Sequence, residues 1–130
     1  MTMELGCKGR AETIVTSEKT AKTAGSGALD VFATPFMAAL MEEAAWTSIQ
    51  PYLEDGQGSV GIALKLTHDA ATPVGMKVWA ESTVTAINGR KVSFSITAYD
   101  ETGVIGTCDH QRAIIDNEKF FTRCQNKLNH

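Results

Sequence analysis

The stretch that decides the fold is Thr34-Pro-Phe-Met-Ala-Ala-Leu-Met-Glu-Glu-Ala-Ala-Trp-Thr-Ser-Ile-Gln50, and Pro51 follows it directly. Pro35 suits the first turn of a helix, where its missing N–H is not needed, and Thr34 is a residue type that caps helix N-termini. The residues between them and Pro51 are mostly good helix formers, and Pro51 ends the run. Because this segment is apolar over most of its circumference, it predicts one long, buried helix.

The segments on either side of this helix have the period of β-strands. Hydrophobic residues alternate with small or polar ones in residues 59–68, which predicts one buried face. Asn88-Gly89 is a strong hairpin signal between two further strand patterns. The expected strands are residues 11–17, 59–68, 77–87, 90–99 and 104–115, with Phe120-Phe121 as a candidate extension of the last.

One helix among five strands indicates an α+β fold with an antiparallel sheet, because parallel strands would need more crossover helices. A curved five-stranded antiparallel sheet wrapped around one long central helix, the hotdog fold, satisfies every burial pattern above. The pattern alone also allows other α+β sheets that pack a single helix. The chain has 130 residues, which suits one domain over residues 1–130. We expect residues 1–9 and 124–130 to be frayed tails.

Composition excludes several partner classes. Twelve Lys and Arg against fifteen Asp and Glu give a net charge of −3, which argues against a nucleic-acid partner. No apolar stretch is long enough to span a membrane, and the N-terminus lacks the pattern of a signal peptide. Cys7, Cys108 and Cys124 have neither disulfide nor zinc-site spacing, so we expect reduced thiols in a cytoplasmic protein and no metal site.

Three residues are candidates for chemistry. Glu42 has apolar neighbours one helical turn away on either side, so its ionisation should be costly; the alternative is a solvated carboxylate beside Glu43. His68 continues the register of the buried strand face and is either a catalytic or a structural histidine. Thr34 has a structural explanation as a helix cap. It precedes Glu42 by eight residues, about 12 Å along a regular helix, which rules out a direct hydrogen bond between them.

Other motifs narrow the chemistry. The sequence lacks a nucleophile elbow, a zinc-protease motif, a phosphate-binding loop and a dinucleotide fingerprint. Hotdog hydratases carry an Asp five residues before a catalytic His. Ala63 and Ile105 occupy those positions before His68 and His110, which disfavours hydration of an enoyl thioester.

The motifs resemble one known family over residues 10–122. They are Val31-Phe-Ala-Thr34-Pro35, Leu40-Met-Glu42-Glu-Ala-Ala, Gly61, Thr67-His68-Asp69-Ala70 with Thr72-Pro73-Val74-Gly75, Asn88-Gly89-Arg90, Gly106 and His110-x-Arg112. Together they resemble the fluoroacetyl-CoA thioesterase-like branch of the hotdog thioesterases. The resemblance implies that Thr34, Glu42 and His68 carry the catalysis, that Gly61 lines the substrate site, and that Arg112 matches an arginine of the family.

The resemblance further implies hydrolysis of an acyl-CoA thioester at a site shared by two copies of a homodimer, with no cofactor, because coenzyme A is part of the substrate. The bulk of Phe32 and Phe36, with Met37 and Trp46, suggests a small acyl group. Arg90, Lys91 and Arg112 are candidates for the CoA phosphates, or are solvated strand cations. A non-catalytic acyl-CoA or small-ligand binding module, and a protein that uses the fold only to dimerise, remain alternatives.

Overall fold

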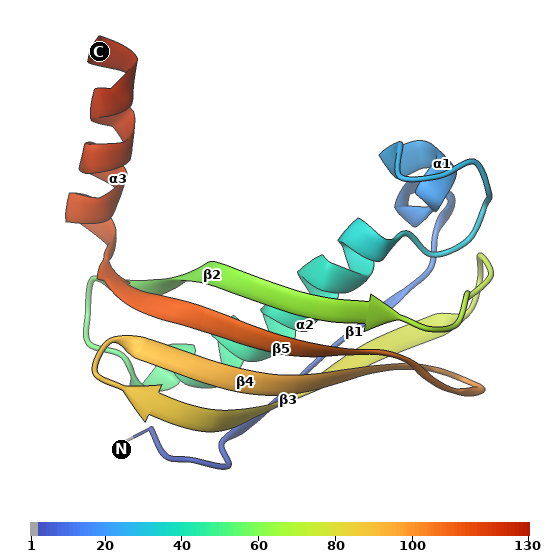
Figure 1. Ribbon diagram of the computed structural model, residues 1–130, viewed down its shortest axis with the longest axis horizontal. Coiled ribbons are helices and arrows are strands. Elements are labelled where there is room, and N and C mark those ends of the chain that lie inside the picture. The colour runs from blue at the N-terminus through green and yellow to red at the C-terminus, as the bar shows by residue number, and fades with distance from the viewer. Residues whose placement is uncertain (1–2) are drawn as a thin grey trace.

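The computed structural model describes residues 3–130 as one curved sheet with a long helix packed across it (Figure 1). The strands are β1 (Lys8–Ile14), β2 (Gln57–His68), β3 (Lys77–Asn88), β4 (Lys91–Asp100) and β5 (Gly103–Asp116). The helices are α1 (Ala21–Ala24), α2 (Thr34–Ile49) and α3 (Asn117–Gln125). Short 3-10 turns cover Ser17–Lys19, Gln50–Tyr52 and Asn126–Asn129.

The sheet is antiparallel throughout and has the order β1-β3-β4-β5-β2. The two strands that flank α2 in the sequence, β1 and β2, therefore form opposite edges of the sheet. The β3–β4 hairpin turns at Asn88-Gly89 as predicted, and Gly89 has a φ of 63°, which favours glycine. This architecture confirms the predicted hotdog fold.

Helix α2 crosses the inner face of the sheet and packs mainly against β1 and β3. Its buried residues recur every three or four positions and face the strands. They are Met37, Leu40, Met41, Ala44, Ala45 and Ile49. The opposite face stays open within one chain, where Phe36 is 36% and Trp46 41% exposed. The expectation of a helix buried on most sides was therefore wrong for a single chain.

The ends of the chain differ from the prediction. The first strand covers residues 8–14 rather than 11–17, because pairing with β3 sets its limits. The Gly6 amide donates to the Val84 carbonyl and the Val84 amide donates to the Cys7 carbonyl, which holds residues 6–7 to the sheet. The expected frayed segment 1–9 is therefore partly attached to the sheet. Residues 1–2 lie outside the described part. Residues 124–130 continue a helix and a 3-10 turn instead of fraying, and Phe120-Phe121 belong to α3 rather than to a strand.

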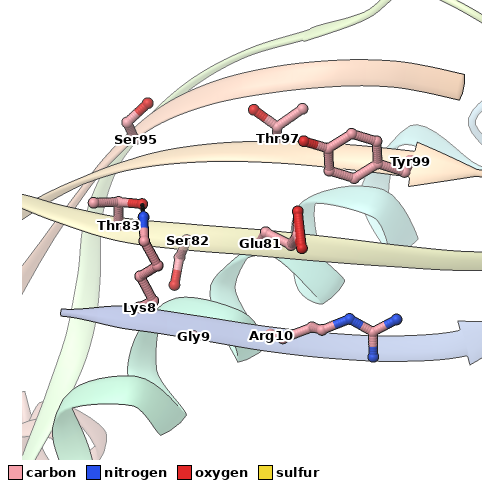
Figure 2. A pocket seen from close by; sticks show the side chains of 9 residues that line it. All are labelled: Lys8, Gly9, Arg10, Glu81, Ser82, Thr83, Ser95, Thr97 and Tyr99. Atoms are coloured by element: carbon pink, nitrogen blue, oxygen red, sulfur yellow. Dashed lines mark hydrogen bonds between the residues drawn. The ribbon is translucent and has the colours of Figure 1, made fainter. Parts of the chain in front are cut away.

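The outer face of the sheet carries a shallow polar groove of about 580 Å³, on the side away from α2. Figure 2 shows that its side chains come from β1, β3 and β4, with Lys8 donating a hydrogen bond of 3.1 Å to Thr83. None of the residues predicted for the catalytic site lies in this groove. No helix within residues 3–130 is long and apolar enough to cross a membrane.

Candidate active site

Thr34 is the first residue of α2, and its hydroxyl contacts His68 at the end of β2. The distance between Thr34 Oγ1 and His68 Nδ1 is 2.7 Å. The N-cap residue is Ala33, whose carbonyl accepts from the backbone amides of Phe36 and Met37, and no side chain caps the helix. The prediction that Thr34 caps α2 was therefore wrong. Its hydroxyl is instead committed to the imidazole of a residue 34 positions away.

His68 is held in an environment that favours the neutral imidazole. Burial lowers its pKa, and the Ala70 backbone and the Asp69 carboxylate only partly oppose this effect. Its Nε2 atom is buried and has no hydrogen-bond partner among residues 3–130. The ring of Phe32 meets the imidazole edge-on, with centroids 6.4 Å apart. A neutral His68 can accept a proton from the Thr34 hydroxyl or from a water molecule.

A cavity of about 240 Å³ opens beside the Thr34–His68 pair. It is lined by α1 and the segment before α2 on one side, and by the segment after β2 on the other. These residues are Ala21, Ser26, Val31, Phe32, Thr34 and residues 68–71. Phe32 borders this cavity. Phe36 does not, since it lines a separate hollow of about 220 Å³ next to Leu40 and Glu43.

Glu42 forms a second centre two turns further along α2. Its carboxylate accepts a hydrogen bond of 3.0 Å from Arg112 Nη1 on β5. The Arg112 guanidinium also donates to the hydroxyl and the carbonyl of Ser59 on β2, at 2.8 and 3.0 Å. Glu42 is therefore neither an isolated carboxylate among apolar residues nor a freely solvated one. Its side chain is 33% exposed, and a buried arginine supplies the counter-charge.

His110 on β5 completes this second centre through its contact with Arg112. The ring is almost fully buried and stacks on Phe94, with Nδ1 2.8 Å from the Ala63 carbonyl and Nε2 3.1 Å from Arg112 Nη1. The carbonyl requires a proton on Nδ1, so Nε2 accepts from the guanidinium. Burial, with the Arg112 charge, lowers the pKa of His110 and keeps it neutral. Burial likewise lowers the pKa of Arg112, which Glu42 opposes.

Gly61 lies where β2 passes Glu42. A Cβ atom built on this glycine would lie 2.3 Å from Glu42 Oε2 and 3.2 Å from His110 Cε1, so any side chain here would displace the carboxylate. The pairing of β2 with β5 shifts between Gly61 and Ala63, which marks a β-bulge. The bulge turns Gly61 to the same inner face as His68. Continuous alternation across residues 60–68, as predicted, would have put them on opposite faces.

The structure thus divides the predicted residues into two centres on one helix. Thr34, His68 and Phe32 form the first, whereas Glu42, Gly61 and Arg112 form the second. Sequence reasoning missed Ser59 and left the role of His110 open, because both act through Arg112, which is far from Glu42 in the chain. Within residues 3–130, no three or more His, Cys, Asp or Glu side chains are grouped so that they could hold a metal ion.

Solved structures place the chain in the class of hotdog-fold thioesterases. A thioesterase superfamily member from Thermus thermophilus shares 29% identity with it and superposes with a TM-score of 0.87, over 97% of this chain and 96% of the other. A substituted form of the fluoroacetyl-CoA-specific thioesterase FlK superposes more closely. The TM-score is 0.92 at 36% identity, over 98% of both chains.

The sequence comparisons narrow the class to one family. The model of the family described as fluoroacetyl-CoA-specific thioesterase matches residues 15–118. The fluoroacetyl-CoA thioesterase of Streptantibioticus cattleyicolor is 43% identical over 98 residues, which cover 75% of this chain and 70% of that protein. The chain belongs to the fluoroacetyl-CoA-specific thioesterase family and is a thioester hydrolase of the acyl-CoA thioesterase type.

Proposed function

We propose that this protein hydrolyses a short acyl-CoA thioester to the free acid and coenzyme A at the Thr34–His68 pair. The 2.7 Å contact between the Thr34 hydroxyl and the neutral imidazole carries the proposal, since it joins an oxygen nucleophile to a base. The cavity of about 240 Å³ beside the pair suits a small acyl group. Related FlK structures contain fluoroacetate, or acetyl-CoA with its two-carbon acyl group, and both acyl units are of this small size.

Each residue has a role in this proposal. His68 takes the proton from the attacking oxygen, which belongs either to Thr34 or to water, and returns it to the departing thiolate of CoA. The start of α2 carries a partial positive charge that stabilises the oxyanion formed on the thioester carbonyl. Glu42, oriented by Arg112, acts either as a base for water or as a nucleophile. Both the acyl-enzyme route and direct attack by water fit these roles.

The separation of the two centres supports a homodimer with shared active sites. β2 is an edge strand of twelve residues, with Ile62 46% and Leu64 41% exposed. We take it to pair with β2 of a second copy, antiparallel about a twofold axis between Ile62 and Ala63, because an unpaired edge of this kind readily binds another strand. Gly61 marks where Glu42 meets β2. In this pairing, Gly61 of the second copy lies opposite Leu64, which is four residues along the strand from His68, whereas the chain's own Gly61 is seven residues from His68. Glu42 of the second copy is therefore nearer to the Thr34–His68 pair than the chain's own Glu42.

A thiol-release assay over short, branched and aryl acyl-CoA thioesters tests the proposal. We expect turnover to be fastest with two- and three-carbon acyl groups, and to fall at least about 100-fold in His68→Ala, the loss typical of a removed acid–base group. Thr34→Val, which removes only the hydroxyl, should also lose activity, whereas Thr34→Ser should retain part of it. Saturable binding of acyl-CoA without thiol release would instead support the non-catalytic binding module.

A further inference from the structure

Helix α3 extends away from the body of the protein. It begins directly at the end of β5, where the Asp116 carboxylate accepts from the Lys119 amide at 3.3 Å, and it projects past the β2 edge of the sheet (Figure 1). None of its residues is buried against the rest of residues 3–130. A nine-residue helix is marginal in water on its own, so α3 requires a surface to pack against.

The side chains of α3 and the following turn form two adjacent stripes. Lys119 and Arg123 are four residues apart and so lie on one side of α3, and Lys127 follows four residues later in the 3-10 turn that extends the helix. The neighbouring stripe is apolar and well exposed, with Phe120 at 42% and Phe121 at 53%. Such a helix can dock through its apolar stripe while the cations beside that stripe face an anionic ligand.

The position of α3 in the sheet determines what it can reach. Asp116, its N-cap, pairs with Gln57 at the start of β2. In the antiparallel pairing of two β2 strands described above, Gln57 lies opposite His68 of the second copy. Asp116 is then two strand spacings, about 10 Å, from that His68. α3 runs outward beyond the β2 edge (Figure 1). In the pairing described above, this direction takes it beside the second copy's Thr34–His68 cavity.

We propose that α3 of each copy docks on the Thr34–His68 end of the other copy, where Lys119, Arg123 and Lys127 bind the phosphates of CoA. This inference rests on the proposed thioesterase dimer and assigns its CoA-binding cations. The described residues that line the cavity include Asp69 but no lysine or arginine. A protein of net charge −3 needs a local source of positive charge to hold the phosphates of this substrate, and α3 supplies it from the second copy.

The first test removes the charges of α3. In Lys119→Gln/Arg123→Gln/Lys127→Gln we expect the KM for acetyl-CoA to rise about tenfold, as for three exposed ion pairs, and the rise to shrink at high salt. The same variant should show no such rise with the N-acetylcysteamine thioester of acetate, which lacks the phosphates. Lys8→Gln/Arg10→Gln, which removes exposed cations from the outer groove in Figure 2, is the control and should leave both KM values unchanged. An equal rise in KM for both thioesters, or no rise for either, overturns the proposal.

The second test asks whether α3 acts on the other copy. The α3 triple variant, with His68 intact, is mixed with a His68→Ala chain that has a native α3, under conditions in which subunits exchange. If α3 serves the other copy, the working sites in the mixed dimers regain the low KM for acetyl-CoA. If α3 serves its own chain, the KM stays high after mixing, and the proposal is wrong.

Binding measurements separate this inference from the proposed hydrolysis. Isothermal titration with CoA alone reports on the phosphate site whether or not the protein turns over a thioester. Wild-type protein that binds CoA without hydrolysis, and loses that binding in the α3 variant, would refute the proposed function but uphold the role of α3. An active wild-type protein whose affinity for CoA is unchanged in the α3 variant would uphold the proposed function and refute the role of α3.

Discussion

At the scale of single residues, the proposed site depends on keeping two histidines neutral, the half-buried His68 and the buried His110. In the proposed mechanism His68 accepts a proton, and in the structure His110 accepts a hydrogen bond from Arg112, so a charge on either ring removes that role. Burial lowers the pKa of both imidazoles below the ordinary value. The proposed base is therefore neutral at neutral pH, with no carboxylate of residues 3–130 hydrogen-bonded to the His68 ring.

The pH dependence of turnover follows from this environment. Because the pKa of His68 is lowered, its neutral form persists below pH 6.5, the ordinary pKa of histidine. We expect kcat/KM for a short acyl-CoA to stay level from pH 8 down to 6.5 and to fall only at more acidic pH. A pH–rate profile measures this. An acidic limb centred at or above 6.5 would show that His68 is not the base, or that it is not shielded.

The same shift affects stability. In the unfolded chain both histidines take up protons near pH 6.5, whereas in the folded chain they do so only at lower pH. The unfolded state therefore binds more protons as the pH falls from about 6.5 toward the folded pKa values. The contribution of these residues to the free energy of unfolding is complete above that range and declines within it.

Arg112 is the residue whose loss should be most costly in the second centre. Arg112→Gln leaves Glu42 without its counter-charge and His110 Nε2 and Ser59 without a donor. We expect the free energy of unfolding to fall by about 2 kcal/mol, less than for a fully buried pair because Glu42 is one-third exposed. Urea denaturation measures this. Adding Glu42→Gln to the same chain should recover part of the loss; if the two losses simply add, the ion pair contributes nothing.

At the scale of elements, β2 combines three features in one strand. These are the bulge at Ile62, Gly61 against the Glu42 carboxylate, and His68 at the end of the strand. The one-residue shift lets an edge strand serve both centres from the same face. Without the bulge, either Gly61 or His68 would face away from α2.

Gly61→Ala tests this arrangement directly. The new methyl group would lie 2.3 Å from Glu42 Oε2, so the carboxylate must move by about an ångström or more. We expect kcat to fall about 10- to 100-fold, the typical cost of such a displacement of a reacting group. The melting temperature should change little, because a carboxylate that is one-third exposed can swing aside. A variant with unchanged kcat would show that Glu42 does not depend on its position against Gly61.

Local patterns in the sequence predicted the helix and the strands well, but predicted only in part which side chains of different elements contact each other. The helix limits were evident from Pro35 and Pro51, and the central hairpin from Asn88-Gly89, because each acts within a few residues. The bulge in β2 was not evident, since hydrophobic residues alternate without a break across it. The Glu42–Arg112 pair joins positions 70 residues apart, and Thr34 was read as a cap because a threonine before a proline normally is one. The family resemblance singled out these residues, whereas their partners required the fold.

At the scale of the whole molecule, the proposed dimer depends on the exposed β2 edge. Ile62→Lys places a charge in the middle of the proposed strand pairing. We expect this variant to remain folded by circular dichroism, to sediment as a monomer, and to lose most of its thioesterase activity, because Glu42 of the second copy is then absent. The matched control is Ile14→Lys on β1, at the opposite edge of the sheet, where the native side chain is 55% exposed. A wild-type protein that sediments as a monomer at micromolar concentration while active would contradict the shared site.

The order of the strands also has a consequence for folding during synthesis of the chain. β1 is synthesised first but pairs with β3, so Ile14 has no strand partner until Lys77 has been synthesised. At about 5–20 residues per second, that delay is about 3 to 13 s on the ribosome. In the last part of this delay, after Ile49 has been made, α2 is complete but β3 and β4, which complete the cover over Met37, Met41 and Ile49, are not. The nascent protein therefore carries an uncovered apolar helix for seconds, and its yield in a cell should depend on chaperones that shield this helix until β3 and β4 have emerged.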